Sequence, residues 1–164
     1  MAEPPVAIEP IASDQASVLA NLFELYVHDF SEQLPLELKA NGRFDLPLDE
    51  AWWKSAEHFP FFIRAQGKLL GFALARRGSR VTSNADVMDV AEFFVVRGAR
   101  QRGVGKRAAL ALFAAFPGRW EIRVRQSNRG AKAFWQSVAQ SLRGEPVTWT
   151  AFARGGVDWL VLEL

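Results

Sequence analysis

The segment from Arg97 to Phe113 places five cationic side chains and three glycines in its first eleven residues and then becomes apolar. Gly103 and Gly105 fall where the apolar, helical pattern begins. The first N–H groups of a helix lack intrahelical partners, and the helix dipole adds about half a positive charge there. Without side chains in the way, an anion can reach these amides directly. The segment therefore predicts a phosphate-binding turn. The cations around it are Arg100, Arg102, Lys106 and Arg107.

Two other readings of this segment stay open. A basic run can be a solvated face or a nucleic-acid patch, and a glycine near a helix start can simply permit close packing. The spacing is neither G-x-x-x-x-G-K-[ST], because Lys106 follows a Gly-x-Gly and precedes an arginine, nor G-x-G-x-x-G. These mismatches argue against a nucleotide hydrolase and against a dinucleotide-dependent dehydrogenase.

The elements that position this turn alternate between strand and helix patterns. A strand from Asp86 to Val96 precedes it, and the helix that it opens ends before Pro117-Gly118. Gln66-Gly67 marks a hairpin, and Ser13 is a plausible cap for the first helix. The order predicts a mixed α/β sheet with helices on both faces. Strands are expected at 6–11, 59–65, 68–77, 86–96, 119–125 and in 146–164, and helices at 13–30, 48–58, 103–116 and 127–142.

Length and composition narrow the class of protein. The 164 residues fit one domain, 1–164, and the absence of cysteine excludes disulfides, thiolate catalysis and Cys-ligated metal. The two histidines lie far apart, so we expect no metal site. No apolar run reaches membrane-spanning length, and the N-terminal sequence lacks a secretory pattern. With a net charge of only +2, the chain is expected to be a cytoplasmic protein that binds neither membrane nor nucleic acid.

Two motifs point to a known family. Arg100-x-x-Gly103-x-Gly105, after the strand sequence AEFFVV, resembles the acetyl-CoA signature Gln/Arg-x-x-Gly-x-Gly/Ala of the GNAT N-acetyltransferase superfamily. SNRGAKAFW resembles the second family motif, Asn-x-x-Ala-x-x-Phe-Tyr. The segments AEFFV, RWEIRV and AFW are similar to those of a group of bacterial acetyltransferases of undetermined substrate. The resemblance implies a GNAT-like, mostly antiparallel sheet of six to seven strands with helices on both faces.

The resemblance also implies a site for acetyl-CoA. The backbone of the strand would hold the pantetheine arm, and the turn would wrap the pyrophosphate. Asn128 would contact the cofactor where the sheet splays, and a helix N-cap is an equally good and compatible role for it. The residues implied are Phe93, Phe94 and Val95 for the arm, and Gln101, Arg102, Gly103, Val104, Gly105 and Lys106 for the pyrophosphate.

The sequence departs from the family pattern at Trp135, which stands where a tyrosine commonly protonates the departing thiolate. An indole cannot act as that acid. Either Tyr26, the only tyrosine, or a water reaches the sulfur, or CoA leaves as a thiolate. We count Trp135 with the cofactor site, although packing on an apolar helix face is its simplest role.

Acetyl transfer to an amine needs a neutral amine, whose usual pKa near ~10 calls for a base. Asp89 and Glu92 are the candidates, and in a regular strand residues three apart point to opposite faces. Glu92 is nearer the cofactor motif, whereas Asp89 sits in the phase resembling the carboxylate of histone-type relatives. Alternatively, Glu92 pairs with Arg123, and neither Glu92 nor Asp89 acts as the base. The Val95 N–H could hold the oxyanion if the strand bulges there.

The resemblance implies an acceptor side built by the first two helices, the loop between them and the last strands. Tyr26, His28 and Asp29 place polar groups there. A carboxylate such as Asp29 or Glu32 would suit a cationic amine, although surface solvation explains such residues more often. An exposed helix position is the alternative for His28.

These observations predict an acetyl-CoA-dependent N-acetyltransferase that transfers directly, through a ternary complex, to a small-molecule or peptide amine. The missing cysteine removes the usual covalent carrier. A non-catalytic acyl-CoA-binding module is the alternative, and Trp135 favours it slightly. We expect a monomer or a homodimer.

Overall fold

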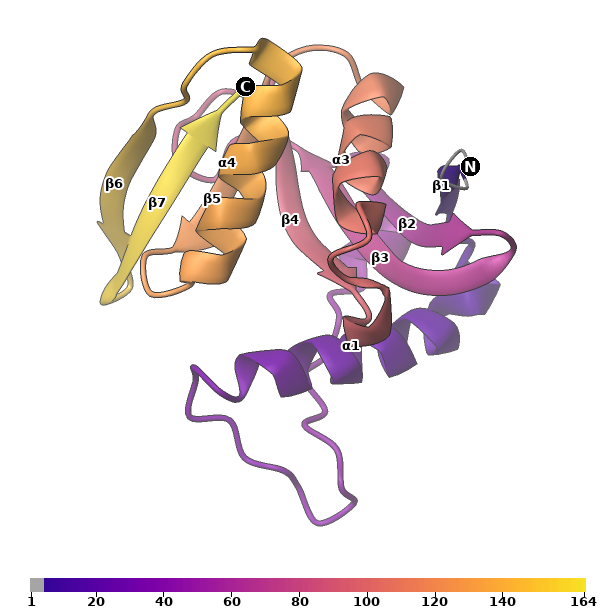
Figure 1. Ribbon diagram of the computed structural model, residues 1–164. Helices are drawn as coiled ribbons and strands as arrows, with labels where there is room; N and C mark the ends of the chain where they lie inside the picture. Colours follow the sequence, from indigo (N-terminus) through magenta and orange to yellow (C-terminus); the bar gives the residue numbers. More distant parts are fainter. Residues whose placement is uncertain (1–4) are drawn as a thin grey trace.

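A seven-stranded sheet forms the centre of the protein (Figure 1). The computed structural model describes residues 5–164, so residues 1–4 of the expected domain and the N-terminal end of the sequence lie outside it. The strand order is β1-β2-β3-β4-β5-β7-β6, and only the pair β4–β5 is parallel. The expected mostly antiparallel sheet is therefore confirmed. The strands are β1 (Val6–Pro10), β2 (His58–Ala65), β3 (Lys68–Arg77), β4 (Met88–Val95), β5 (Trp120–Arg125), β6 (Trp149–Arg154) and β7 (Val157–Glu163).

Helices cover both faces of the sheet, as the sequence predicts (Figure 1). On one face, Leu19 and Leu22 of the first helix pack against Phe72 and Leu74 of β3. The other face forms a larger core with the third and fourth helices, whose buried residues include Leu112 and Val138. The helices are α1 (Ala16–Phe30), α2 (Ala51–Lys54), α3 (Val104–Ala115) and α4 (Arg129–Arg143).

The start of α1 differs from the expectation. A 3₁₀ turn over Ser13–Gln15 precedes α1, and the Gln15 N–H donates to the Ala12 carbonyl at 2.9 Å. Ser13 therefore lies inside this turn, and no side chain caps α1. The predicted Ser13 cap is wrong because the chain enters the helix through a tighter turn.

Two tight turns fix the hairpins of the sheet. Gln66 and Gly67 have φ values of 51° and 72°, and Gly155 and Gly156 have 59° and 72°. Two consecutive residues with positive φ form the turn type whose twist matches paired strands. The hairpin β2–β3 and the hairpin β6–β7 are thus set by local sequence. No helix within residues 5–164 is long and apolar enough to cross a membrane.

Strands β4 and β5 separate part of the way along their length (Figure 1). Their parallel pairing joins Met88–Val90 to Trp120–Ile122 and goes no further. β4 continues to Val95, and β5 continues to Arg125. The sheet is therefore open between the carboxyl-terminal halves of two central strands, where the sequence predicted a splay.

Candidate active site

A cavity of about 980 Å³ occupies the opening between β4 and β5 and extends under α1. Most of its lining comes from β4, β5, α1 and the loop after α1, and the rest from the α3 turn, the start of α4, Arg76 of β3 and Trp159 of β7. Ten of the residues expected in the site line it: Tyr26, Asp29, Glu92, Phe93, Phe94, Val95, Gln101, Gly105, Asn128 and Trp135. His28, Asp89, Arg102, Gly103, Val104 and Lys106 do not. The cavity therefore brings together most of the predicted cofactor strand and one of the two candidate bases.

The β4 backbone turns two of its N–H groups toward this cavity. The Val96 N–H donates to the Leu70 carbonyl of the neighbouring β3 side at 2.8 Å. Because alternate residues of a strand point their N–H groups to opposite sides, those of Val95 and Phe93 point away from β3, toward the opening. An extended ligand chain can pair with them as an added strand would.

A β-bulge changes which face of β4 the two carboxylates occupy. Arg76 of β3 lies opposite Asp89, and Leu74 lies opposite Glu92. A separation of two positions on β3 is thus matched by a separation of three on β4. The extra residue is Ala91. Arg76 and Leu74 share a face because they are two apart, and Asp89 and Glu92 therefore share it too. The expectation of opposite faces is wrong, because one inserted residue reverses the alternation. The irregularity also lies at Ala91 and not at Val95.

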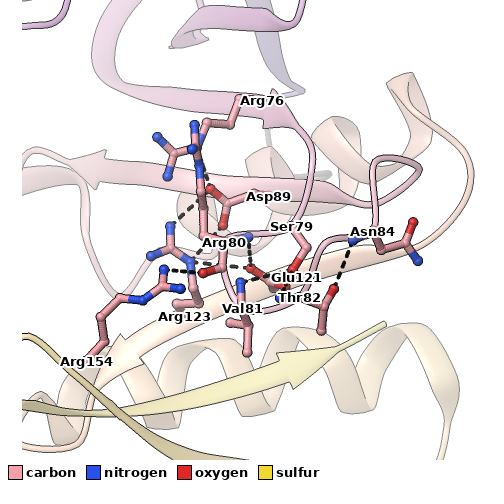
Figure 2. A network of polar contacts seen from close by, with 10 residues as sticks. All are labelled: Arg76, Ser79, Arg80, Val81, Thr82, Asn84, Asp89, Glu121, Arg123 and Arg154. Carbon is pink, nitrogen blue, oxygen red and sulfur yellow. Dashed lines mark hydrogen bonds and ion pairs between the residues drawn. The ribbon is translucent and has the colours of Figure 1, made fainter.

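Asp89 is the centre of a buried ion-pair network (Figure 2). Its side chain is 0% exposed, and it accepts from Arg76 Nε at 2.8 Å. Arg123 donates to both of its oxygens, from Nε and from a terminal nitrogen, each at 3.0 Å. The alternative pairing of Glu92 with Arg123 is therefore wrong, since Arg123 donates to Asp89. Asp89 holds two guanidinium groups together and has no face toward the cavity.

The network continues to Glu121 on β5 (Figure 2). Glu121 is 2% exposed and accepts from the Ser79 hydroxyl, from the Arg80 N–H at 2.9 Å, and from Arg123 Nε at 3.5 Å as an ion pair. Sequence reasoning missed this carboxylate. The signal was the alternation of Glu121, Arg123 and Arg125 along β5, which places all three on one face.

Glu92 differs from Asp89 in its partner. Its carboxylate accepts a hydrogen bond from the Tyr26 hydroxyl of α1, across 66 residues of sequence. Burial raises the pKa of Glu92 above its ordinary value, against the opposing effects of Tyr26, Arg76 and Arg123. Burial and the Glu92 charge raise the pKa of Tyr26 as well. Glu92 thus combines a raised proton affinity with a place on the cavity wall, which a general base requires.

The turn before α3 provides the other end of the cavity. Gly103 has a φ of 69° and Gln101 a φ of 60°, and no side chain caps α3. The left-handed backbone at Gly103 explains this glycine. A Cβ on Gly105 would lie 3.1 Å from the Phe134 ring of α4, so close packing explains the second glycine. A left-handed backbone therefore accounts for Gly103, and close packing against α4 accounts for Gly105.

Arg97 and Arg100 do not surround the turn as free charges. Both donate to the carboxylate of Asp29 on α1, Arg97 from Nε at 2.8 Å. Arg100 also donates from Nε to the Val95 carbonyl at 2.7 Å. Arg100 thus ties the end of β4 to α1, which corrects its expected place among the phosphate cations. Burial alone would raise the pKa of Asp29, but hydrogen bonds from Arg100 and Arg97 hold it below its ordinary value.

Replacing Asp29 with asparagine is expected to cost about 0.5–1 kcal/mol of unfolding free energy at neutral pH, the range for partly exposed pairs. Because the pKa of Asp29 is lowered on folding, this stability is present above the ordinary aspartate pKa of about 3.9 and is lost as pH falls through the lowered value. Urea unfolding of both proteins between pH 2 and pH 7 measures it. A difference that persists undiminished at the lowest pH would contradict the prediction.

The remaining predicted residues have plain structural positions. Asn128 caps α4, since its Oδ1 accepts from the Ala131 N–H at 3.0 Å, and it also lines the cavity. Trp135 is 5% exposed and packs edge-to-face on Phe93 at 5.1 Å between ring centroids. His28 is exposed, and its ring contacts Phe44 outside the cavity.

The fold and this site combine an opening between two central strands with a helix N-terminus beside it. The model of the family described as acetyltransferase (GNAT) family matches residues 19–139, which is most of the chain. The chain belongs to the GNAT acetyltransferase family.

Solved structures with the same fold include three acetyltransferases. One from Thermus thermophilus has a TM-score of 0.69 at 22% identity, with 100% of both chains covered. Arabidopsis thaliana NAA60, solved with acetyl-CoA, has a TM-score of 0.60 at 12% identity and 97% coverage of both. An aminoglycoside acetyltransferase from an uncultured soil metagenomic sample, solved with sisomicin, has a TM-score of 0.62 at 11% identity, covering 91% of this chain and 97% of that one. No curated protein matches this chain.

Proposed function

We propose that this chain is an acetyl-CoA-dependent N-acetyltransferase that transfers the acetyl group directly to a primary amine. The observation that carries the proposal is the position of Glu92, a half-buried carboxylate on the wall of the cavity into which the Phe93 and Val95 N–H groups point. In the reaction, the amine nitrogen attacks the thioester carbonyl, Glu92 takes the amine proton, and the C–S bond breaks to release CoA.

The chain's own groups would hold acetyl-CoA along β4 and at the α3 turn. The N–H groups of Phe93 and Val95 would pair with the pantetheine arm. Phe94, between them, also lines the cavity. The amides at the start of α3 would bind the pyrophosphate, with charge from Arg102 and Lys106. NAA60, which shares the fold, was solved with acetyl-CoA. That complex supports the same cofactor for this chain.

Tyr26 would position the base and not the leaving group. Its hydroxyl donates to Glu92, which fixes the carboxylate oxygen and leaves the second oxygen for the amine or a bridging water. Trp135 has no acidic proton and is packed in the core. CoA would therefore leave as a thiolate or take its proton from water.

A thiol-release assay with acetyl-CoA tests the proposal. The acceptors are simple primary amines, aminoglycosides, free amino acids and peptide N-termini. Release of CoA that depends on an amine supports the transferase. Tight binding of acetyl-CoA with no release in the whole set would instead favour the non-catalytic acyl-CoA-binding module, for which Trp135 at the tyrosine position is the supporting feature.

Removing two cations beside the turn should weaken cofactor binding. The double variant R102A/K106A is expected to raise the Kd for acetyl-CoA about tenfold, because each side chain would contribute a modest, salt-screened attraction to the phosphates. Calorimetric titration at two salt concentrations measures this, and the salt dependence should shrink in the variant. Arg143→Ala, an exposed arginine at the end of α4, is the control. Equal affinity of all three proteins would place the phosphates elsewhere.

A further inference from the structure

Three arginines lie on the sheet face that Glu92 shares and line the cavity next to it. Arg76 is on β3, two residues from Leu74, the residue opposite Glu92. Arg123 and Arg125 are two residues apart on β5, so their side chains share a face, and Arg123 pairs with Asp89 on that face. Glu92 and the three arginines all line this one cavity.

Arg76 and Arg123 retain donors after pairing with Asp89. Arg76 uses only Nε for this contact, and its terminal amino groups point away from the carboxylate (Figure 2). Arg123 uses Nε and one terminal nitrogen. A guanidinium group carries five N–H donors, so both side chains can hold Asp89 and a second anion at once.

Arg125 has no carboxylate partner among residues 5–164, and it is held by an aromatic ring. Its guanidinium lies 5.3 Å from the Trp159 ring centroid, and Arg123 lies 5.9 Å from the same ring. Trp159 lies directly opposite Arg125 on β7 and also lines the cavity. The Trp159 ring orients the Arg125 guanidinium group without neutralising its positive charge.

The carboxylates near the three arginines already accept hydrogen bonds or ion pairs from other side chains. Asp89 is fully engaged by two arginines, and Glu121 accepts from Ser79, Arg80 and Arg123. Glu92 accepts from Tyr26 and is the proposed base. At the other end of the cavity, Asp29 is taken up by Arg97 and Arg100. At the Glu92 end, Arg125 is therefore the one of the three arginines that has no carboxylate partner among residues 5–164.

We infer that the acceptor is a small amine that carries its own anionic oxygen group a few bonds from the nitrogen, as a free amino acid does. This inference rests on the proposed transferase function. The anionic group would bind Arg76, Arg123 and Arg125, which would hold the amine against Glu92. The same positive charge disfavours polycationic acceptors such as aminoglycosides. It also replaces our expectation that Asp29 would attract a cationic amine.

The first experiment compares matched acceptors in the thiol-release assay. The panel holds the twenty standard amino acids, the primary amides of those that react, and O-phosphoethanolamine against ethanolamine to separate carboxylate from phosphate recognition. An amide has the less basic amine, so it would react faster if only the neutral amine mattered. We expect an acid or phosphate to exceed its neutral partner in kcat/KM by at least about tenfold. Equal or better turnover of the neutral partners overturns the inference.

The second experiment replaces Arg125 with glutamine. This arginine is the cleanest to remove, because its loss leaves no buried carboxylate without a partner. The variant is expected to lose about tenfold in kcat/KM for the anionic acceptor through KM, with little change for the neutral partner. Arg143→Gln is the control and should match the wild type. An equal loss for both acceptors would assign Arg125 a purely structural role.

A binding measurement separates failure of the inference from failure of the proposed function. Calorimetric titration of the acid and its amide into the protein saturated with CoA, which has no acetyl group to transfer, reports the anion site alone. Preferential binding of the acid without thiol release from acetyl-CoA would keep the anion site and reject the transferase. Amine-dependent release without any preference for the acid in either assay would keep the transferase and reject the anion site.

Discussion

Replacement of Glu92 with glutamine is expected to lower kcat by about 10²- to 10³-fold, the usual contribution of a positioned general base. Glutamine keeps the size of the side chain and an oxygen that can accept from the Tyr26 hydroxyl, so the cavity wall should remain intact. Acetyl-CoA affinity should be unchanged, because its proposed contacts lie on the β4 backbone and the α3 turn. Steady-state thiol release together with calorimetric titration separates the two effects.

The pH dependence gives the same prediction a second test. Because burial raises the pKa of Glu92, the acid limb of kcat/KM should lie above the ordinary glutamate value of about 4.3 and should vanish in the glutamine variant. A carboxyl that binds its proton more tightly when folded destabilises the folded state as pH rises through the raised pKa. Glu92→Gln should therefore be no less stable than the wild type at pH 7.

The matched control is Glu163→Gln, an exposed carboxylate on β7 that does not line the cavity. It should keep wild-type kcat and the wild-type acid limb. If Glu92→Gln retains more than about half of wild-type kcat, Glu92 is not the base, and proximity can supply much of the rate.

Replacement of Asp89 with asparagine is expected to lower the unfolding free energy by about 3 kcal/mol at pH 7. The cause is the loss of a fully buried carboxylate that accepts three hydrogen bonds from Arg76 and Arg123. Asparagine presents an amide NH2 group to one of these donors, leaves Arg76 without this counter-charge, and leaves Arg123 with only its longer ion pair to Glu121. Urea unfolding at pH 7 measures the difference.

Asp158→Asn, on the exposed side of β7, should stay within about 0.5 kcal/mol of the wild type in the same experiment. A similarly small change in Asp89→Asn would mean that solvent replaces the lost charge, and that the network contributes little to stability. The two carboxylates of β4 thus have opposite expected phenotypes: loss of Glu92 affects turnover, and loss of Asp89 affects folding.

The sequence predicts the fold well where local chemistry decides it. Gln66-Gly67 and Gly155-Gly156 determine their hairpins, and Pro117-Gly118 follows the end of α3. The opening between β4 and β5, and the residues along β4 that face it, follow from two motifs with characteristic spacing. These features depend on a few adjacent residues, so one chain is enough to read them.

The partner of each charged group could not be predicted, because pairing depends on distant parts of the chain. Arg123 pairs with Asp89 and not with Glu92, and Arg100 turns from the phosphate turn to Asp29 on α1. Fifteen arginines offer each carboxylate many possible partners. Only the sheet order and the register select among them, and the glycine reading likewise required the position of Phe134 on α4.

The extra residue at Ala91 has a consequence for how positions along β4 are compared between proteins. Asp89 and Glu92 are three residues apart in the sequence, a spacing that would place them on opposite faces of a regular strand. Their partners on β3, Arg76 and Leu74, are only two apart, so the two carboxylates share a face. Deleting Ala91 would restore a regular ladder and leave Asp89 and Glu92 on one face, two residues apart. Pairing Ala91 in a regular ladder at unchanged chain length would instead turn the Glu92 side chain through the sheet, into the apolar layer that holds α3 and α4. The strand therefore contains a counting offset of one, and an alignment of fixed spacing that ignores it would match this carboxylate to a core position.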